Sequence, residues 1–438
     1  MTKLHFISLG CPKNLVDSEV MLGDLIAKGF VLTDDPAEAE AIIVNTCAFI
    51  EDAKKEAIDT ILEMGVHKKS GRCRLLAVVG CLPQRYRDEL AGLLPEVDLF
   101  VGAGEFPKIA EFMKSWNGEQ AVHVARPSYI YDHETPRLHT TPRHVGYLKI
   151  AEGCFHPCSF CVIPRVRGKF RSRPVKSIVE EAQGMLGHGV RELNVIAQDV
   201  TAYGRDIGAD IATLMEELAR LPGPKWIRLL YAYPHGFPAG LVDVIRDNVG
   251  ICKYIDIPIQ HISGRILKSM RRGGGEREIR DLLRLIRREV PDISLRTSFI
   301  VGYPGETEEE FDELVDFVCE ERFDHAGVFV FSPEEGTPAA ALKKRVPPDV
   351  AEARRAELMD AQREVSLSNN MRFVGKRLNV LIEGPSAESP HLIQARHEGQ
   401  APDVDGVVYI NEGKATAGEF AEVEITEAQE YDLIGKVV

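Results

Sequence analysis

Short apolar segments alternate with helical patterns over the first part of the chain. Four mostly apolar runs predict buried strands, and each is followed by apolar residues at helical spacing. These strands are expected at Leu4–Leu9, Ala41–Val44, Leu75–Val79 and Val97–Val101. Strands that alternate with helices in this way are typical of a doubly wound parallel sheet. We therefore expect an N-terminal α/β domain over residues 3–117. Residues 118–139 contain Pro127, Pro136 and several polar residues, and are expected to form a linker.

The alternation of strands and helices resumes from about Gly146 with a longer repeat. Six strands are expected, at Gly146–Ala151, Glu192–Ala197, Trp226–Tyr231, Tyr254–Pro258, Ser294–Val301 and Gly327–Phe331. Helical stretches separate them, for example Val175–Leu186 and Glu308–Cys319. Six βα units fit a partial TIM-like barrel, (β/α)6, better than a complete eight-fold one, and the active site of such a barrel lies at the carboxyl ends of its strands. Residues 140–373 are expected to form this second domain.

A change from helical to strand periodicity marks the last part of the chain. It follows a long charged helix expected from Asp349 to about Met371. Five short strands, separated by glycines and prolines, are expected at Leu378–Ile382, Leu392–Ala395, Val407–Ile410, Ala421–Ile425 and Leu433–Val438. Such a set is typical of a small OB-like β-barrel. The chain is therefore expected to be an α/β multidomain protein with a third domain at residues 374–438.

Length and composition narrow the class of protein further. A chain of 438 residues is too long for one ordinary core, and 44% hydrophobic with 27% charged residues is typical of a globular protein. Apolar runs long enough to span a bilayer are absent, and Met1–Gly10 lacks the features of a signal peptide. We therefore expect a cytoplasmic protein with no membrane partner. The net charge of −14 argues against a protein that simply coats nucleic acid.

Three cysteines follow the first expected barrel strand at a spacing that suits an iron–sulfur cluster. Cys154, Cys158 and Cys161 form a C-x3-C-x2-C motif within one short loop. In a reducing compartment, clustered cysteines indicate metal binding or catalysis rather than disulfides. Three thiolates can hold three irons of a cubane cluster and leave the fourth iron open to S-adenosylmethionine, which one electron then splits to a deoxyadenosyl radical. The alternatives are three unrelated cysteines or a zinc knuckle, but His156 lies inside the loop without the spacing of a ligand pair.

Three further cysteines share a position relative to the expected strands rather than a spacing. Cys11, Cys47 and Cys81 each come just after one of the first three strands. The loops that follow parallel strands meet at the carboxyl edge of the sheet, where such folds bind ligands. Gly10 and Gly80 directly precede two of these cysteines and permit a close approach of the backbone. We expect a second metal site here; the alternative is that each cysteine is a small buried hydrophobic residue.

Other candidate residues are explained as well by ordinary structure as by a site. Five polar residues lie in or just after the expected barrel strands and suit contacts to S-adenosylmethionine, or simple caps and turns. They are Gln198, Asp199, Gln260, His261 and Arg296. The three remaining cysteines stand in no common arrangement and are expected to be packing residues. These are Cys73, Cys252 and Cys319.

Both cysteine sets, in this order and followed by a C-terminal barrel, resemble the radical S-adenosylmethionine methylthiotransferases. The likeness covers nearly the whole chain. Motifs of the family are matched at Ser8–Asn14, Asn45–Ala48 and Gly153–Pro164. Residues 374–438 resemble the TRAM module of the family, which is an OB-like barrel. The resemblance therefore agrees with the fold that the periodicity predicts.

The resemblance also implies a cofactor set and a reaction. Cys154, Cys158 and Cys161 would hold the radical [4Fe-4S] cluster, and an auxiliary [4Fe-4S] cluster that carries the sulfur would be held by Cys11, Cys47 and Cys81. The family replaces an unactivated C–H bond by C–S–CH3. One S-adenosylmethionine methylates sulfur at the auxiliary cluster, and a second supplies the radical that abstracts the hydrogen atom. Such an enzyme also requires an electron donor.

The family divides between members that modify an adenosine in transfer RNA and members that modify an aspartate of small-subunit ribosomal protein twelve. Residues 374–438 carry five Lys and Arg against twelve Asp and Glu, a balance of −7. A barrel that grips RNA presents a positive groove, because phosphate contacts supply most of the affinity. An acidic barrel suits a basic ribosomal protein instead, unless it serves only solubility. The segments Tyr254–His261 and Phe331–Gly336 also resemble the ribosomal-protein branch.

A run of positive charges behind the radical loop points the other way. Its members, with no acid among them, are Arg165, Arg167, Lys169, Arg171, Arg173 and Lys176. Such a run could contact RNA, or bind the carboxylates of S-adenosylmethionine and of an aspartate substrate. We expect methylthiolation of the β-carbon of an aspartate in the ribosomal protein, with any RNA contact secondary. The alternatives are methylthiolation of an adenosine in transfer RNA and a non-catalytic iron–sulfur protein that binds RNA.

Overall fold

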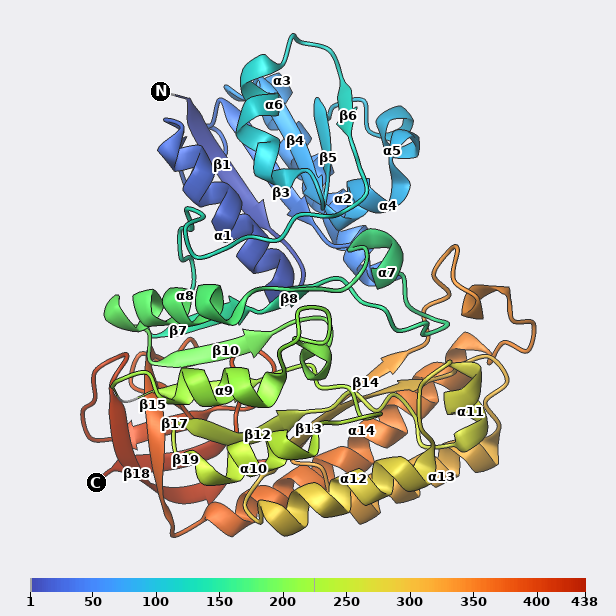
Figure 1. Ribbon diagram of the computed structural model, residues 1–438, viewed down its shortest axis with the longest axis vertical. Helices are drawn as coiled ribbons and strands as arrows, with labels where there is room; N and C mark the ends of the chain where they lie inside the picture. The colour runs from blue at the N-terminus through green and yellow to red at the C-terminus, as the bar shows by residue number, and fades with distance from the viewer. Residues whose placement is uncertain (1, 224) are drawn as a thin grey trace. The chain divides into compact units, whose positions relative to one another are not determined.

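The computed structural model describes residues 2–223 and 225–438 of the chain (Figure 1). The chain divides into two compact units, which are described separately. The first unit comprises the residues up to Thr140, Lys149–Arg173 and Ser332–Ala340, and the second comprises Thr141–Leu148, Pro174–Phe331 and Ala341–Val438. The loop that carries Cys154, Cys158 and Cys161 therefore belongs to the same unit as the N-terminal sheet.

A six-stranded parallel sheet forms the core of the first unit. Its strands are β1 (Lys3–Ser8), β2 (Val31–Leu32), β3 (Ala41–Thr46), β4 (Leu75–Gly80), β5 (Leu99–Gly102) and β6 (Ala121–His123), in the order β2-β1-β3-β4-β5-β6. The helices around it are α1 (Pro12–Ala27), α2 (Glu51–Gly65), α3 (His67–Ser70), α4 (Cys81–Tyr86), α5 (Asp88–Leu93), the 3-10 helix η1 (Phe106–Lys108) and α6 (Ile109–Ser115). Every residue of β3 and β4 is buried, as in central strands covered on both faces. The predicted doubly wound sheet is confirmed.

Two strands of this sheet escaped the sequence pattern. Strand β2 has only two residues, and β6 lies within residues 118–139, which were expected to form a linker. Leu99 pairs with Ala121 and Val101 pairs with His123, so β6 extends the sheet in parallel. The linker prediction was therefore wrong for these three residues. A strand of this length contains too few residues to show an alternating pattern, and its neighbour in the sheet defines it.

The remaining parts of the first unit are short. They contain the two-stranded antiparallel pair β8 (Ala151–Glu152) and β9 (Arg171–Ser172), and the helix α7 (Ile163–Val166) between them. The expected strand Gly146–Ala151 is consequently divided, since β7 (Val145–Lys149) ends before β8 begins. Glu152 pairs with Arg171 across the antiparallel ladder, so the cysteine loop is closed at its base by β8 and β9.

A second six-stranded sheet forms the core of the second unit. Its strands follow the order β14-β13-β12-β11-β10-β7, and the later ones are β10 (Glu192–Ile196), β11 (Trp226–Leu229), β12 (Ile251–Asp256), β13 (Ser294–Val301) and β14 (His325–Val330). Its longer helices are α8 (Val175–Gly187), α9 (Ile211–Ala219), α10 (Ala239–Asp247), α12 (Glu276–Glu289), α13 (Glu308–Glu321) and α14 (Pro348–Asn370). Its shorter helices are α11 (Gly264–Ser269), η2 (Val200–Ala202), η3 (Ala339–Ala341), which ends in this unit, and η4 (Met371–Phe373). The strands are arranged in sequence order and the sheet does not close into a complete barrel. This confirms the predicted partial (β/α)6 barrel.

A closed five-stranded barrel completes the second unit. Its strands are β15 (Arg377–Pro385), β16 (Ile393–His397), β17 (Val408–Glu412), β18 (Phe420–Ala428) and β19 (Leu433–Val437), in the order β15-β16-β17-β19-β18. Alternate residues fill its interior, namely Val380, Ile382, Ala395, Val408, Ile410, Val423, Ile425 and Leu433. The OB-like barrel predicted at residues 374–438 is confirmed, because the period-two pattern places every second side chain inside.

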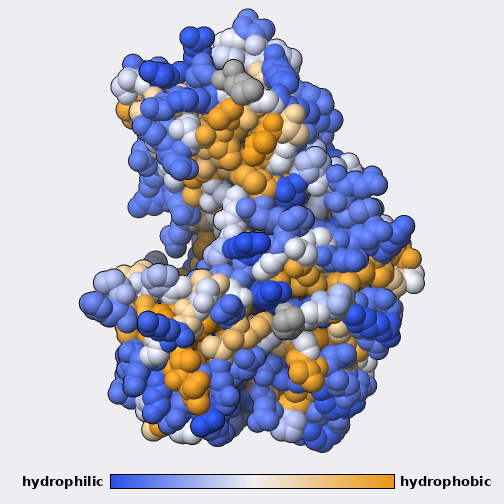
Figure 2. All heavy atoms as spheres, turned by 90° about the vertical axis from the view of Figure 1, so that its left-hand side faces the viewer, coloured by the Kyte–Doolittle hydropathy of each residue, from blue (hydrophilic) through white to orange (hydrophobic). Residues whose placement is uncertain are grey.

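Within the described residues, no helix combines the length and the apolar character needed to cross a bilayer. Hydrophilic side chains dominate the face of the molecule in Figure 2, with smaller hydrophobic groups among them. Such exposed groups are normal on a folded surface. The expected domain boundaries at residues 117, 139 and 373 stay a prediction.

Candidate metal centres

Cys11, Cys47 and Cys81 lie at one edge of the N-terminal sheet, where the sequence predicted them to meet. Cys11 follows β1 and is the N-cap residue of α1, and Cys81 is the first residue of α4, directly after β4. Cys47 comes directly after the last residue of β3. Three parallel strands therefore deliver one thiol each to the carboxyl edge of the sheet, which is the ligand-binding edge of such folds.

Two glycines let the backbone approach the loops of this sheet edge closely. Gly10 has φ of +91°, and a Cβ atom added there would lie 2.7 Å from Cys47 Cβ and 3.3 Å from Cys47 Sγ. Gly80 has φ of +100°, and a Cβ atom added there would lie 2.4 Å from the side-chain oxygen of Asn45. Glycine is required at both places, because only a residue without Cβ tolerates both the conformation and the space.

Two of the three thiols, Cys47 and Cys81, have raised pKa values. Burial raises the pKa of Cys47, and the neighbouring Cys11 raises it further. Burial raises the pKa of Cys81 to about 12, against the opposing effect of Arg167. Thiols of this kind stay protonated until a metal replaces the proton, because the thiolate is the form that binds metal.

Arg167 connects this edge of the sheet with the chain that follows the cysteine loop. Its Nη2 donates to Cys81 Sγ at 3.3 Å and to Asn14 Oδ1 at 3.0 Å, while Nη1 donates to Asp17. Asp17 also accepts from Lys149, whose Nζ lies 2.8 Å from Glu152. Two cations and two carboxylates therefore compensate one another in the interior, as buried charges must.

The second cysteine set occupies a single loop between β8 and α7. Cys154, Cys158 and Cys161 are all half-buried. The backbone N–H of His156 donates to Cys154 Sγ at 3.4 Å, and that of Ile163 donates to Cys161 Sγ at 3.4 Å. Hydrogen bonds from backbone amides to cysteine sulfur are among the interactions that tune iron–sulfur clusters. Backbone amides of this segment therefore point toward two of the three sulfur atoms.

The donors at both places fit iron–sulfur clusters. In the part of the chain that the structure describes, no three His, Cys, Asp or Glu side chains gather at the spacing of one metal ion. A cubane cluster makes a different demand, since each cysteine binds its own iron. Both places offer cysteines, with amide or guanidinium donors at three of the sulfur atoms, which is the environment that clusters prefer. The assignment of the six cysteines as ligands stays a prediction.

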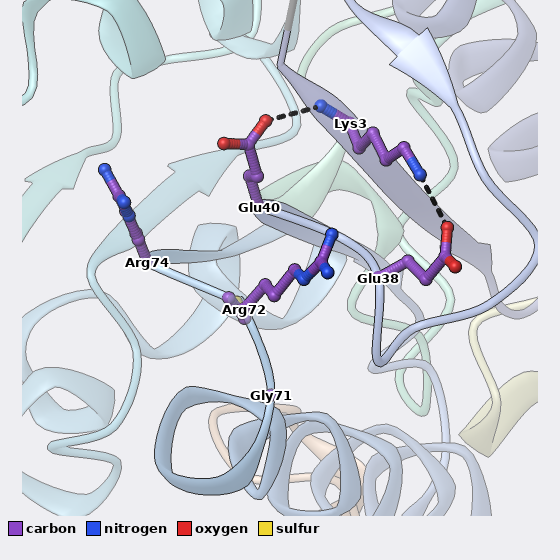
Figure 3. Close-up of a pocket in the computed structure, with 7 residues that line it drawn as sticks. Lys3, Glu38, Glu40, Gly71, Arg72 and Arg74 are labelled. Carbon is purple, nitrogen blue, oxygen red and sulfur yellow. Dashed lines mark hydrogen bonds and ion pairs between the residues drawn. The ribbon is translucent and has the colours of Figure 1, made fainter.

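The other three cysteines have different surroundings. Cys73 lies at the opposite edge of the sheet and is buried, with its Sγ 3.4 Å from the carbonyl oxygen of Leu75. It lines a pocket together with polar residues that include Glu40 and Arg72, and Figure 3 shows this pocket. Cys252 is also buried, so packing is confirmed for these two. The same prediction was wrong for Cys319, which lies on α13 and is exposed.

The run of positive charges does not form one exposed surface. Arg167 and Arg173 are buried, at 3% and 0% exposure, whereas Arg165, Lys169 and Lys176 are exposed. The sequence suggested a surface contact because it shows the charges and not the buried carboxylates that face them. Asp17, six residues after Cys11 on α1, is the partner that sequence reasoning missed.

Most polar residues at the barrel strands are occupied by structural contacts. Asp199 accepts from the backbone N–H of Thr201 at 2.9 Å and caps a short helix. His261 Nδ1 accepts from the N–H groups of the two residues that follow it. Arg296 lies 3.1 Å from Asp256 and 3.2 Å from Asp405. These contacts support the simpler reading as caps, turns and ion pairs.

Comparison with known proteins agrees with this geometry. Residues 3–102 match an uncharacterized protein family, UPF0004, residues 148–318 match the radical SAM superfamily, and residues 374–438 match the TRAM domain. The ribosomal protein uS12 methylthiotransferase RimO of Geobacter sulfurreducens is 52% identical over 440 residues, which cover 100% of this chain and 98% of that protein. The chain belongs to the RimO family. The enzymes of the same name from Geotalea uraniireducens, at 51% identity, and Myxococcus xanthus, at 48%, agree over 100% and 99% of this chain and 98% and 91% of theirs.

Family membership confirms the resemblance on which the sequence prediction relied. The chain is a radical S-adenosylmethionine enzyme of the methylthiotransferase type, and it uses an iron–sulfur cluster together with S-adenosylmethionine. Solved structures share its fold at low identity. The methyltransferase TsrM from Kitasatospora setae, with tryptophan and a SAM analog bound, aligns with a TM-score of 0.59 at 14% identity over 83% of this chain and 89% of its own. The cobalamin-dependent enzyme OxsB aligns with a TM-score of 0.54 at 13% identity, over 82% of this chain and 56% of its own.

Proposed function

We propose that the protein methylthiolates the β-carbon of an aspartate in ribosomal protein uS12. In the overall change a C–H bond of that carbon is replaced by C–S–CH3, and the hydrogen atom leaves on the deoxyadenosyl radical. The methyl group comes from one S-adenosylmethionine, and the radical comes from a second one with an electron from a donor protein. The relatives' name supplies the substrate, and the resemblance of the motifs supplies the aspartate.

The observation that carries this proposal is the presence of two separate cysteine sets in one compact unit. Cys154, Cys158 and Cys161 lie on one loop and would hold the cluster that generates the radical. The set at the edge of the sheet, which consists of Cys11, Cys47 and Cys81, would hold the auxiliary cluster. The auxiliary cluster would supply sulfur within reach of the substrate radical. Arg167, which lies six residues after Cys161, contacts Cys81 of this set.

The surface of the C-terminal barrel supports a basic protein as substrate. Seven of its acidic residues are exposed, namely Glu388, Asp403, Glu412, Glu419, Glu422, Glu427 and Glu430. Of its five basic residues, Arg396 is buried, at 1% exposure, and bound to Glu192. Three of the basic residues, Lys376, Arg377 and Lys414, are exposed, so acids outnumber bases on the exposed surface as they do in the sequence. A surface of this sign attracts a basic ribosomal protein and repels a phosphate backbone.

RNA contact stays secondary in this proposal. The buried positions of Arg167 and Arg173 leave fewer cations behind the radical loop to meet a phosphate backbone than the sequence suggested. A ribosomal substrate also places the reaction in the cytoplasm. A non-catalytic iron–sulfur protein that binds RNA would require neither an open iron nor a second set of thiols.

Anaerobic reconstitution tests the proposal directly. The protein is loaded with iron and sulfide, reduced in the presence of S-adenosylmethionine, and offered uS12 and bulk transfer RNA in parallel. Mass spectrometry is expected to find the methylthio group on an aspartate of uS12, with about eight irons per chain. Transfer of the group to adenosine would contradict the substrate. About four irons without cleavage of S-adenosylmethionine would contradict the enzyme and favour the non-catalytic alternative.

Two alanine variants separate the roles of the two cysteine sets. Cys154→Ala is expected to abolish cleavage of S-adenosylmethionine, because the open-iron cluster is lost. Cys11→Ala is expected to retain radical cleavage and to lose only sulfur transfer. Each variant should bind about half of the iron. Cys73→Ala is the matched control, since its thiol lies at the opposite edge of the same sheet.

A further inference from the structure

We propose that Arg167 sets the reduction potential of the cluster at Cys11, Cys47 and Cys81 through its hydrogen bond to Cys81 Sγ. This inference rests on the proposed function, because it requires a cluster at these three cysteines. It assigns a role to a residue that belongs to neither cysteine motif.

The geometry places a charged donor against one ligand sulfur. Arg167 Nη2 lies 3.3 Å from Cys81 Sγ, and the residue is 3% exposed. A hydrogen bond from a cationic donor is stronger than one from a neutral amide, and a water-poor interior strengthens it further. Cys81 itself is 8% exposed, so little water competes for its sulfur. The positive charge of Arg167 therefore acts on this sulfur at close range.

The surroundings hold the guanidinium group in this orientation. Nη1 donates to Asp17, and it lies 3.6 Å from Glu152. Nη2 also donates to Asn14 Oδ1 at 3.0 Å. Both carboxylates are shared with Lys149, which keeps the four charges balanced. An arginine held on several sides is pre-organised to keep its donor on the sulfur when the charge of the site changes.

The sign of the effect follows from charge. Reduction adds one negative charge to a cluster, and donors to sulfur or nearby cations stabilise that added charge. Arg167 therefore favours the reduced form and raises the reduction potential. Because Arg167 is the C-cap of α7, the helix that follows the radical loop, this donor is also tied to the second cysteine set. Electron transfer to the auxiliary site would depend on the same side chain.

The experiment uses the full chain with only the auxiliary cluster. A parent variant in which Cys154, Cys158 and Cys161 are all changed to Ala is reconstituted and titrated with reductant under EPR detection. Arg167→Met in this parent is expected to lower the midpoint potential by at least 59 mV, which is a tenfold change in the one-electron reduction equilibrium. The midpoint potential of Arg167→Lys is expected to lie between those of the parent and of Arg167→Met, because lysine keeps the positive charge but lacks the planar guanidinium group.

A matched control distinguishes this role from general disruption. Lys149→Met removes a cation from the same carboxylates without removing a donor from sulfur, and is expected to change the equilibrium less than threefold. If the parent takes up no cluster, the proposed auxiliary site is wrong. If it takes up a cluster whose potential and EPR spectrum are the same in Arg167→Met, the inference is wrong. If Arg167→Met binds no iron, the Arg167→Lys variant provides the test. A midpoint potential of Arg167→Lys equal to that of the parent would overturn the inference.

Discussion

Arg85 Nη1 lies 2.5 Å from Glu334 Oε2, although 249 residues separate the two in sequence. Both side chains are almost completely buried, at 7% and 3% exposure. Arg85 is on α4, four residues after Cys81, and also donates to the carbonyl oxygen of Ala48 at 2.9 Å, next to Cys47. Through Arg85, the segment that follows β14 is therefore linked to the segments that carry Cys47 and Cys81.

Glu334→Gln is expected to destabilise the first unit by about 3 kcal/mol, because it leaves buried cations without their partner. Burial acts to raise the pKa of Glu334, but Ser332, Arg85 and Lys54 outweigh it and lower the pKa, so the side chain is a carboxylate at neutral pH. Urea unfolding measures the loss. Glu335→Gln is the control, since this neighbouring carboxylate is exposed. Equal midpoints for the two variants would contradict a structural role for the buried pair.

Gly10→Ala is expected to reduce iron content by about half, because the new Cβ would lie 2.7 Å from Cys47 Cβ and displace that loop. Gly29→Ala provides a close control. Gly29 has φ of +92°, almost the same as the +91° of Gly10, but nothing lies within 4 Å of its added Cβ. Both variants carry the same backbone strain, of about 1 kcal/mol. Iron analysis after reconstitution should therefore distinguish them, and equal losses would show that strain alone is responsible.

The contact between the C-terminal barrel and the barrel strands of the second unit is expected to weaken in acid. Glu192 is fully buried, and Arg396 and Arg228 overcome the effect of burial and lower its pKa to about 2, from 4.5. Because its pKa is lowered, the Glu192 carboxylate stabilises the fold above pH 4.5 by about 3 kcal/mol. This stabilisation is lost as the pH falls toward 2. Thermal unfolding between pH 7 and pH 2 measures it.

Glu192→Gln should already have a lower stability at pH 7, and its stability should fall less steeply between pH 7 and pH 2 than that of the unchanged protein. Glu424→Gln is the comparison. Its carboxylate lies 3.8 Å from Lys436 in an ion pair that is more than a third exposed, and such pairs contribute less than about 1 kcal/mol. An unchanged acid limb in Glu192→Gln would show that other carboxylates govern acid unfolding.

Replacement of Cys319 by Ser is expected to leave iron content and stability unchanged, because its side chain is exposed on α13. Cys252→Ser places a hydroxyl group in a fully buried position and is expected to cost about 1–3 kcal/mol without loss of iron. Iron analysis and urea unfolding of both variants check these expectations. Loss of iron in either variant would show that the set of six ligands is incomplete.

Periodicity in the sequence was sufficient to predict the three larger sheets, apart from the short strands β2 and β6. The residues of β3 and β4 are buried throughout and mostly apolar because both faces of the strands are covered, and the alternation in β15 to β19 reflects a barrel with one interior. The place of Cys11, Cys47 and Cys81 also followed from the sequence. Once strands are parallel, the residues that come after them must meet at one edge.

Contacts between distant segments were beyond the reach of the pattern. The three residues of β6 become a strand only because β5 lies beside them, and Cys319 looked like a packing residue until its face of α13 proved to be exposed. Arg167 looked like part of an exposed basic run, and only the fold shows Asp17 and Cys81 around it. The sequence by itself determined the elements and the order in which cysteines follow strands, because these depend on local periodicity. The tertiary structure alone decided which charges are buried together, because burial depends on neighbours that are far away in the chain.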